Sequence, residues 1–498
     1  MTRGAWALAV TLGAAAWAAA PAAAQGPEAC DDTVAVDAHR YYRQLSLDLR
    51  GHVPSVAELE RLEGVSEAEV DGLLEGEGFD TFVRRHHLDL LWSALEPGNF
   101  LHEAYTLLLP AAFVEGGTDY TDRLFTLFVG LYQRGGLVPC LDAPAEWDAE
   151  GNLVFEAQPD GTRREGYVLV EPYWAPGTEV KVCAAEAGLE LQANNGASCD
   201  DYTGMVTGTC GCGPNLMRCA SYDVALELAD AFREQVLQMV QAPIAEGRPY
   251  TDMLTSDAEL LNGPLVHYYR HLAPMAVDPI VLRGPVAPAD LPDIPYTDKA
   301  WRPAPREHAE HAGVLTSVAY LLRFPTARAR ANRYYHAFLC QPFVAPPDGL
   351  PSPNDPCSSE PDLRERCGCS SCHTQLEPAA AYWGRFAEAG TLYLDPEQFP
   401  TYLPRCAQCA QDPNVACDGF CQRFYVSEIG HPKQAPFAGV LKSYEFRPPA
   451  EIANLEAGPG ALVQRSVDDG RLARCVSEKL FERLYKRAPT ARELAFDV

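Results

Sequence analysis

Two cysteines and a histidine stand at a fixed spacing in the last third of the chain. Cys369, Cys372 and His373 form the pattern C-x-x-C-H within the stretch RERCGCSSCHTQLEP. Two thiols at this spacing match the vinyl groups on one edge of a haem, and the histidine that follows can reach the iron as proximal ligand. The pattern predicts one covalently attached haem c, held by Cys369 and Cys372 and ligated by His373. Because Cys367 lies two residues upstream, a disulfide from one of these three thiols is the alternative.

The remaining cysteines indicate an oxidising compartment. Seventeen cysteines are many for a reducing compartment and normal for an oxidising one. Setting aside the two proposed thioether cysteines leaves an odd number, so at least one further thiol is unpaired, ligated or bonded to another chain. Cys210 and Cys212 are too close in sequence to bond to each other, so we expect each to pair elsewhere. A second cluster could bind zinc or form two disulfides, and the compartment favours disulfides; its members are Cys406, Cys409, Cys417 and Cys421.

The N-terminus predicts export. Arg3 precedes an apolar stretch from Ala5 to Ala20, and Ala22-Ala23-Ala24 forms an A-x-A cleavage site, so residues 1–24 read as a signal peptide. No later segment is apolar for long enough to predict a membrane span. We expect a periplasmic, cell-surface or secreted protein, where haem c is attached in bacteria.

The charge of the chain restricts its partners. The formal net charge is −28 at pH 7. Such a chain is repelled by nucleic acid and by anionic lipid surfaces. We therefore expect no nucleic-acid partner, and a redox partner protein with a basic surface.

The hydrophobic pattern predicts a mainly α, multidomain helical scaffold with a cytochrome-c-like haem segment and two disulfide-rich, partly β insertions. Strands are expected in EGYVLVEPYW (165–174) and TEVKVC (178–183). The expected parts are a signal peptide (1–24), an N-terminal helical domain (25–135), a Cys-rich insertion (136–222), a helical domain (223–283), a Pro-rich linker (284–306), a haem-carrying domain (307–395), a second Cys-rich insertion (396–450) and a C-terminal helical domain (451–498).

Local signals fix several helix boundaries. Ser55-x-x-Glu58 and Ser66-x-x-Glu69 are capping boxes, and Asp80 and Asp223 are read as caps of later helices. Apolar spacing or turn residues predict helices over 38–98, within 99–135, over 223–242, 307–323 and 326–340, from Pro378, and over 461–487. His86 and His87 are adjacent on a helix and point to different faces, which favours a structural role over shared metal binding.

Several segments together resemble one family. They are RQLSLDLRGHVPSVAEL (44–60), EVDGLLEGEGFDTFVRRHHLDLLW (69–92), RPYTDMLTSDAELLNGPLVHYY (248–269), the stretch 311–347, CSSCHTQLEPAAAYWGRF (369–386) and 468–495. In this order they resemble the large exported cytochrome-c-like proteins of planctomycetes and myxobacteria, which are built from tandem domains of unknown function. The chain departs from the family pattern where Glu377 replaces Asp and Ala379-Ala380 replaces a Gly-Phe turn. The resemblance implies a haem protein with redox or electron-transfer activity and no known substrate.

The second axial ligand would decide the function. No methionine follows Met275, so a downstream methionine ligand is excluded. His431 is the candidate distal ligand, with His308, His311 and His336 as alternatives, and an open position remains a further one. Three functions follow: a six-coordinate electron carrier, which we favour; a peroxidase-like haem oxidoreductase with an open site; and a haem-free, disulfide-stapled surface protein that binds partners.

Overall fold

The computed structural model describes residues 37–91, 109–110, 125–126, 140–188, 191–192, 196–199, 210–275, 285–307, 310–343, 352, 354–412, 414–490 and 493. The predicted signal peptide and His308 lie outside them. The chain divides into two compact units, Met1–Phe79 and Asp80–Val498. Among the described residues, no helix combines the length and the apolar character that a membrane span requires.

The first unit contains three short helices, α1 (Ala38–Arg50), α2 (Val56–Arg61) and α3 (Glu67–Leu73). Both predicted capping boxes are confirmed. Hydrogen bonds from the Ser55 hydroxyl and amide lower the pKa of Glu58 to about 2. The next helix, α4 (Glu77–Leu91), starts at Glu77, so the prediction that Asp80 caps it is wrong.

Two short strands are described after α4. β1 (Leu109–Pro110) pairs antiparallel with β2 (Phe125–Thr126), where helical runs were predicted. Within 136–222, the stretch predicted as the first Cys-rich insertion, β3 (Glu156–Ala157) pairs with β4 (Arg163–Arg164). β5 (Tyr167–Val170) pairs with β6 (Val180–Cys183), which confirms both predicted strands. Three disulfides close this insertion, and Cys210 and Cys212 do pair elsewhere; the bonds are Cys140–Cys183, Cys199–Cys210 and Cys212–Cys219.

A long helix follows the insertion. The turn η1 (Pro214–Leu216) leads into α7 (Tyr222–Ala245), whose cap is Ser221 rather than Asp223. Short elements follow, of which α9 is fully buried: α8 (Asp252–Thr255), β7 (Ala258–Leu261), α9 (Gly263–His267), the π-helical turn η2 (Tyr268–Leu272), and the 3-10 turns η3 (Ala273–Met275) and η4 (Pro288–Asp290). The stretch 284–306, predicted as a linker, contains β8 (Arg302–Pro305), which pairs antiparallel with β7.

The segment around the C-x-x-C-H pattern is helical. It contains η5 (Gly313–Thr316), α11 (Val318–Arg323), α12 (Ala327–Phe338), η6 (Pro356–Ser359), α13 (Ser370–Ala380) and η7 (Ala381–Trp383). The helix predicted over 307–323 is therefore reduced to η5 and α11. α13 starts at Ser370 and holds Pro378 in its interior, so the predicted start at Pro378 is wrong.

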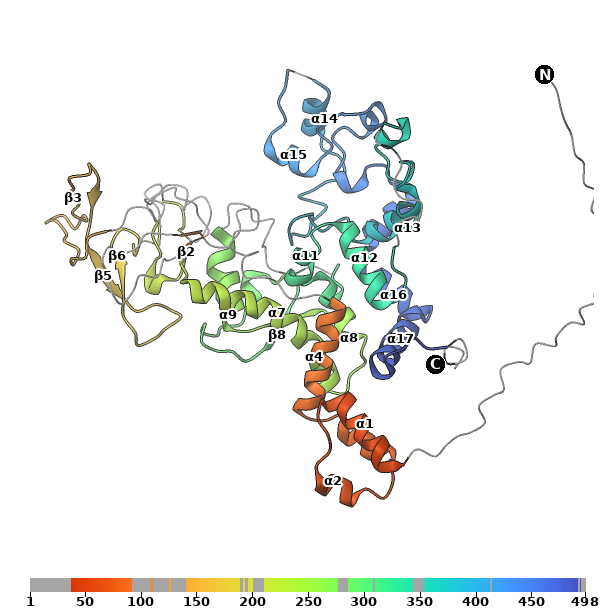
Figure 1. Ribbon diagram of the computed structural model, residues 1–498. Helices are drawn as coiled ribbons and strands as arrows, with labels where there is room; N and C mark the ends of the chain where they lie inside the picture. The colour runs from red at the N-terminus through yellow and green to blue at the C-terminus, as the bar shows by residue number, and fades with distance from the viewer. Residues whose placement is uncertain are drawn as a thin grey trace, which may run out of the picture. The chain divides into compact units, whose positions relative to one another are not determined.

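The remaining elements are α14 (Pro404–Gln411), α15 (Gly419–Phe424), η8 (Pro432–Phe437), η9 (Lys442–Tyr444), α16 (Pro449–Asp468) and α17 (Arg471–Tyr485). The expected last helix over 461–487 is thus two helices, separated by Gly470 in the left-handed region. α13 packs against both α12 and α16 (Figure 1), and η7, which contains the fully buried Trp383, packs against α16 and α12. The fold is mainly α, as predicted.

Candidate functional site

The C-x-x-C-H pattern occupies the first turn of α13. Cys369 is the residue before the helix, and the amides of Cys372 and His373 both donate to its carbonyl, at 3.2 and 3.0 Å. Residues three and four apart on a helix share one face, so this turn brings the two thiols and the imidazole to the same side. All three residues are half-buried.

The disulfide pattern separates these two thiols from the other cysteines. Seven disulfides use fourteen of the sixteen cysteines in the described residues. Cys369 and Cys372 form none of these bonds. Cys367, the competing neighbour, is bonded to Cys357, with the two Cα atoms 5.4 Å apart. The remaining cysteine, Cys30, lies outside the described residues.

The ring of His373 is held by a carboxylate on its own helix. Nδ1 of His373 lies 2.6 Å from Oε1 of Glu377, one turn further along α13. An ionised carboxylate only accepts hydrogen bonds, so Nδ1 carries the proton and donates it. In the neutral ring, the lone pair is then on Nε2. Metal-ligating histidines commonly make a contact of this kind.

Two arginines fix Glu377 in turn. Arg328 of α12 contacts Oε1 at 2.6 Å through Nε, and Arg447 contacts Oε2 at 3.0 Å. Arg447 also bonds to Glu451 of α16 at 2.8 Å, and Arg364 bonds to Glu451 at 2.9 Å. Burial alone would raise the pKa of Glu377, but its contacts with Arg328, His373 and Arg447 outweigh burial and lower it. The carboxylate is therefore charged at neutral pH.

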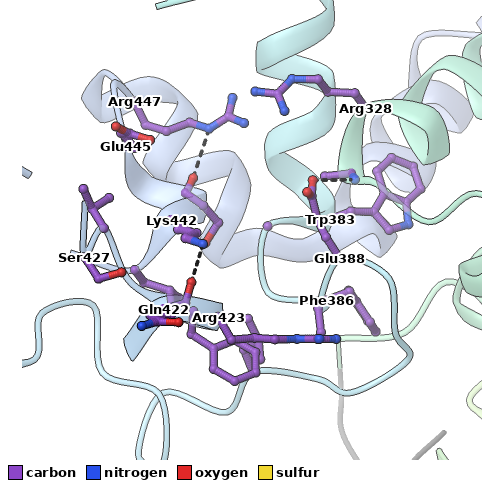
Figure 2. A pocket seen from close by; sticks show the side chains of 18 of the residues that line it. Arg328, Trp383, Phe386, Glu388, Gln422, Arg423, Ser427, Lys442, Glu445 and Arg447 are labelled. Carbon is purple, nitrogen blue, oxygen red and sulfur yellow. Dashed lines mark hydrogen bonds between the residues drawn. The ribbon is translucent and has the colours of Figure 1, made fainter. Parts of the chain in front are cut away.

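A cavity of about 680 Å³ lies beside this ionic cluster (Figure 2). Arg328 and Arg447 line it, together with Lys442 and the aromatic side chains of Trp383 and Phe424. A smaller cavity of about 220 Å³ shares Arg328 and Arg447 and reaches Glu377. The residues lining either cavity include neither motif thiol nor His373. The smaller cavity thus adjoins Glu377, and both cavities adjoin the two arginines that hold it.

The candidate distal ligand, His431, stands next to the segment that leads into the motif. Its neighbour Lys433 bonds to Glu360 at 2.8 Å and to Glu365 at 2.7 Å. The His431 ring itself caps η8, because Nδ1 accepts the Lys433 amide hydrogen at 3.2 Å. A neutral ring that accepts at Nδ1 carries its proton on Nε2, which is the opposite tautomer to that of His373.

Two of the other candidate histidines have separate surroundings. His336 lies on α12 with Nδ1 3.4 Å from Nη1 of Arg333. Burial and the charge of Arg306 lower the pKa of His311. Neither of them shares a hydrogen bond or an ion pair with His373 or Glu377 among the contacts described for these residues.

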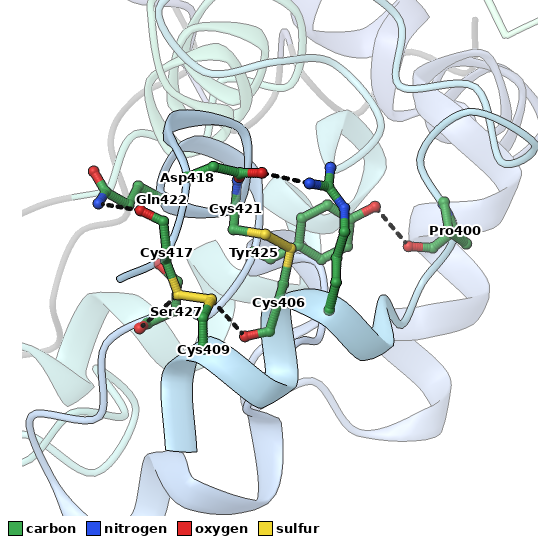
Figure 3. Close-up of a disulfide and its surroundings, with 10 residues drawn as sticks. Pro400, Cys406, Cys409, Cys417, Asp418, Cys421, Gln422, Tyr425 and Ser427 are labelled. Carbon is green, nitrogen blue, oxygen red and sulfur yellow. Dashed lines mark hydrogen bonds and ion pairs between the residues drawn. A yellow bond between two sulfur atoms is a disulfide. The ribbon is translucent and has the colours of Figure 1, made fainter. Parts of the chain in front are cut away.

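The four cysteines of the second insertion are bonded in pairs (Figure 3). Cys406 pairs with Cys421 and Cys409 with Cys417, with Cα distances of 5.3 and 5.1 Å that suit disulfides. A sulfur in a disulfide has no thiolate to offer zinc. Within the described residues, no group of three or more His, Cys, Asp or Glu side chains is arranged around a metal position. This structure therefore corresponds to the disulfide alternative.

The sequence pointed to His373 but not to its partners. The spacing of His373 and Glu377, four residues apart in a helix, is a signal that could have identified the contact. Arg328 and Arg447 are far from the motif in sequence, and no local pattern marks them. Comparisons with known protein families, with characterised proteins and with solved structures found no match.

Proposed function

We propose that this chain is an exported c-type haem protein that carries one haem on Cys369 and Cys372, with His373 as the proximal ligand. The observation that carries the proposal is the disulfide pattern. Seven disulfides use the other fourteen described cysteines, and the two left as thiols stand at attachment spacing on one helical turn. A chance C-x-x-C-H pattern in an oxidised chain would give no reason for these two thiols to stay outside the disulfides.

The chemistry of His373 fits the proposal. Its Nδ1–H is donated to Glu377, so the lone pair needed for iron is on Nε2. When bound, the haem supplies one-electron chemistry, and the protein adjusts it through ligand basicity and burial. The residues of the chain hold the imidazole in one tautomer and one orientation.

Electron transfer to a protein partner is the favoured activity. The net charge of −28 would attract a partner with a basic surface and would increase the rate of encounter at low salt. The disulfides agree with an oxidising compartment, which is also where haem c is attached.

A haem oxidoreductase is the second candidate, and the position of His431 favours it. Nδ1 of His431 accepts a backbone hydrogen bond from Lys433, so this ring would have to leave its cap before it could bind iron through Nε2. If His431 stays in place and none of His308, His311 and His336 replaces it, a haem held by His373 would be able to bind water or a substrate.

Attachment can be tested in a host that matures c-type haem. Cys369→Ala or Cys372→Ala should weaken attachment, because each removes one thioether. The control is the double variant Cys357→Ser/Cys367→Ser, which removes the neighbouring disulfide without leaving a single thiol behind, and should still acquire haem. If haem is lost from the control but kept in both alanine variants, the assignment of the attachment pair is wrong.

Carbon monoxide distinguishes the carrier from the oxidoreductase. A reduced protein with His431 on the iron should resist carbon monoxide, and His431→Ala should bind it. A wild-type protein that binds carbon monoxide at once, with an unchanged response in His431→Ala, would favour the oxidoreductase. The absorbance spectrum of the reduced protein reports both results.

A further inference from the structure

We propose that Glu377 is a positioning residue for the iron ligand: it fixes His373 in the Nδ1–H tautomer and increases the basicity of Nε2. This inference rests on the proposed function and adds to it the residue that sets the haem potential. The surrounding arginines limit how strongly Glu377 acts, as the contacts below indicate.

Two arginines and burial fix the position of Glu377. Arg328 reaches both carboxylate oxygens, with Nε 2.6 Å from Oε1 and Nη2 3.2 Å from Oε2. Arg447 reaches Oε2 at 3.0 Å and also donates to the backbone carbonyl of Glu377. The side chain is only 7% exposed. With so little freedom, Oε1 stays directed at Nδ1 of His373.

The chemical consequence follows from the charge of the acceptor. A carboxylate that accepts the Nδ1–H bond draws the proton partly away and gives the ring imidazolate character, which raises its basicity at Nε2. A stronger donor stabilises ferric iron more than ferrous iron and lowers the reduction potential. Arg328 and Arg447 share the negative charge of Glu377, so we expect the effect to be partial.

The chain offers a matched control in the same cluster. Glu451 is as buried as Glu377, with 7% of its side chain exposed, and it also binds Arg447. Its other partner is Arg364 at 2.9 Å. Because His373 is not among these partners, Glu451→Gln removes a nearby buried charge and leaves the bond to the imidazole in place.

The test compares reduction potentials of haem-loaded Glu377→Gln, Glu377→Asp and Glu451→Gln. Glu377→Gln should raise the potential more than Glu451→Gln does, and Glu377→Asp, which retains the charge, should return it toward the wild-type value. Equal shifts of the potential in the two glutamine variants would show that Glu377 acts only as a nearby buried charge, and would overturn the inference.

A second readout needs no haem. In the full chain carrying Cys369→Ala/Cys372→Ala and ¹⁵N-labelled histidine, the nitrogen shifts at alkaline pH should show the Nδ1–H tautomer of His373. That tautomer should be lost in Glu377→Leu, which has no acceptor for the Nδ1–H, and kept in Glu451→Gln. An unchanged tautomer in Glu377→Leu would overturn the inference. A wild-type chain that acquires no haem would overturn the proposed function, and the tautomer would still decide the role of Glu377.

Discussion

His87 shows what a histidine does in this chain when it is not a ligand. Its ring is 3% exposed, with Nδ1 2.7 Å from the Val83 carbonyl and Nε2 2.7 Å from the hydroxyl of Tyr250. Burial lowers the pKa of His87 to about 4 and that of its neighbour His86 to about 3. Both rings are packed and neutral, which confirms the structural role predicted for the pair.

The buried ring of His87 makes stability depend on pH. The folded pKa of about 4 lies below the ordinary value of 6.5, so the unfolded chain binds one more proton in this interval. The stabilisation is fully present above pH 6.5 and is lost as the pH falls toward 4, with a loss of about 2 kcal/mol by pH 5. Urea unfolding at pH 7.5 and 5 should therefore show a smaller pH effect in His87→Gln than in wild type. His39→Gln, at an exposed site, should lose as much stability between pH 7.5 and 5 as wild type does. An equal loss in the two variants would contradict the role given to His87.

Arg330 marks a limit of residue-level prediction from sequence. Its guanidinium is fully buried and donates to five backbone carbonyls, those of Leu321, Phe324, Phe386, Ala387 and Gly390. Burial lowers the pKa of Arg330 to about 10, so the side chain is still charged at neutral pH. An arginine in a polar-looking helix gives no sign of this role, because its partners are set by tertiary contacts. The contacts of Arg328 and Arg447 with Glu377 could not be predicted from the sequence for the same reason.

At the scale of elements, the prolines gave a wrong helix start at Pro378 and left the strand β8 unpredicted. Pro378 predicts a helix start, because proline is favoured at the first helical position. The hydrogen bonds from Cys372 and His373 to Cys369 show that the helix forms earlier, and Pro378 lies near its end. In β8, Pro303 and Pro305 alternate with Arg302 and Ala304 on a two-stranded sheet. Proline is tolerated on an edge strand because its missing N–H can face outward.

The disulfides connect elements over very different lengths of chain. Cys340, just after α12, is bonded to Cys475 of α17, 135 residues away, whereas Cys409 and Cys417 are separated by 8 residues. Closing a longer loop removes more entropy from the unfolded chain, about 5 kcal/mol for the long loop and about 2.5 kcal/mol for the short one.

Removing each disulfide should therefore have unequal effects. Cys340→Ala/Cys475→Ala should lower the thermal midpoint more than Cys409→Ala/Cys417→Ala does, measured side by side by calorimetry. Equal midpoints, or a greater loss from the short loop, would show that the long-range bond does not stabilise the packing of α12 and α17.

For the molecule as a whole, the sequence predicted the mainly helical class and the presence of disulfides, and the structure confirms both. Composition and hydrophobic periodicity are enough for these predictions, because neither depends on which distant segments come into contact. The pairing of Cys340 with Cys475, the strand within 284–306 and the ionic cluster around Glu377 depend on which distant segments meet, and one sequence does not contain that information. The haem itself remains a prediction from the motif, now supported by the disulfide pattern.

The central claim is tested most directly by the intact mass of the exported chain, matured in a haem-c-competent host and measured under denaturing, non-reducing conditions. The account predicts the mass of the processed chain plus one haem, with Soret absorbance that stays with the protein after acid extraction. Alkylation before reduction should find no reactive thiol at Cys369 or Cys372. A chain without added mass, whose Cys369 and Cys372 are alkylated or joined in a disulfide, would contradict the claim.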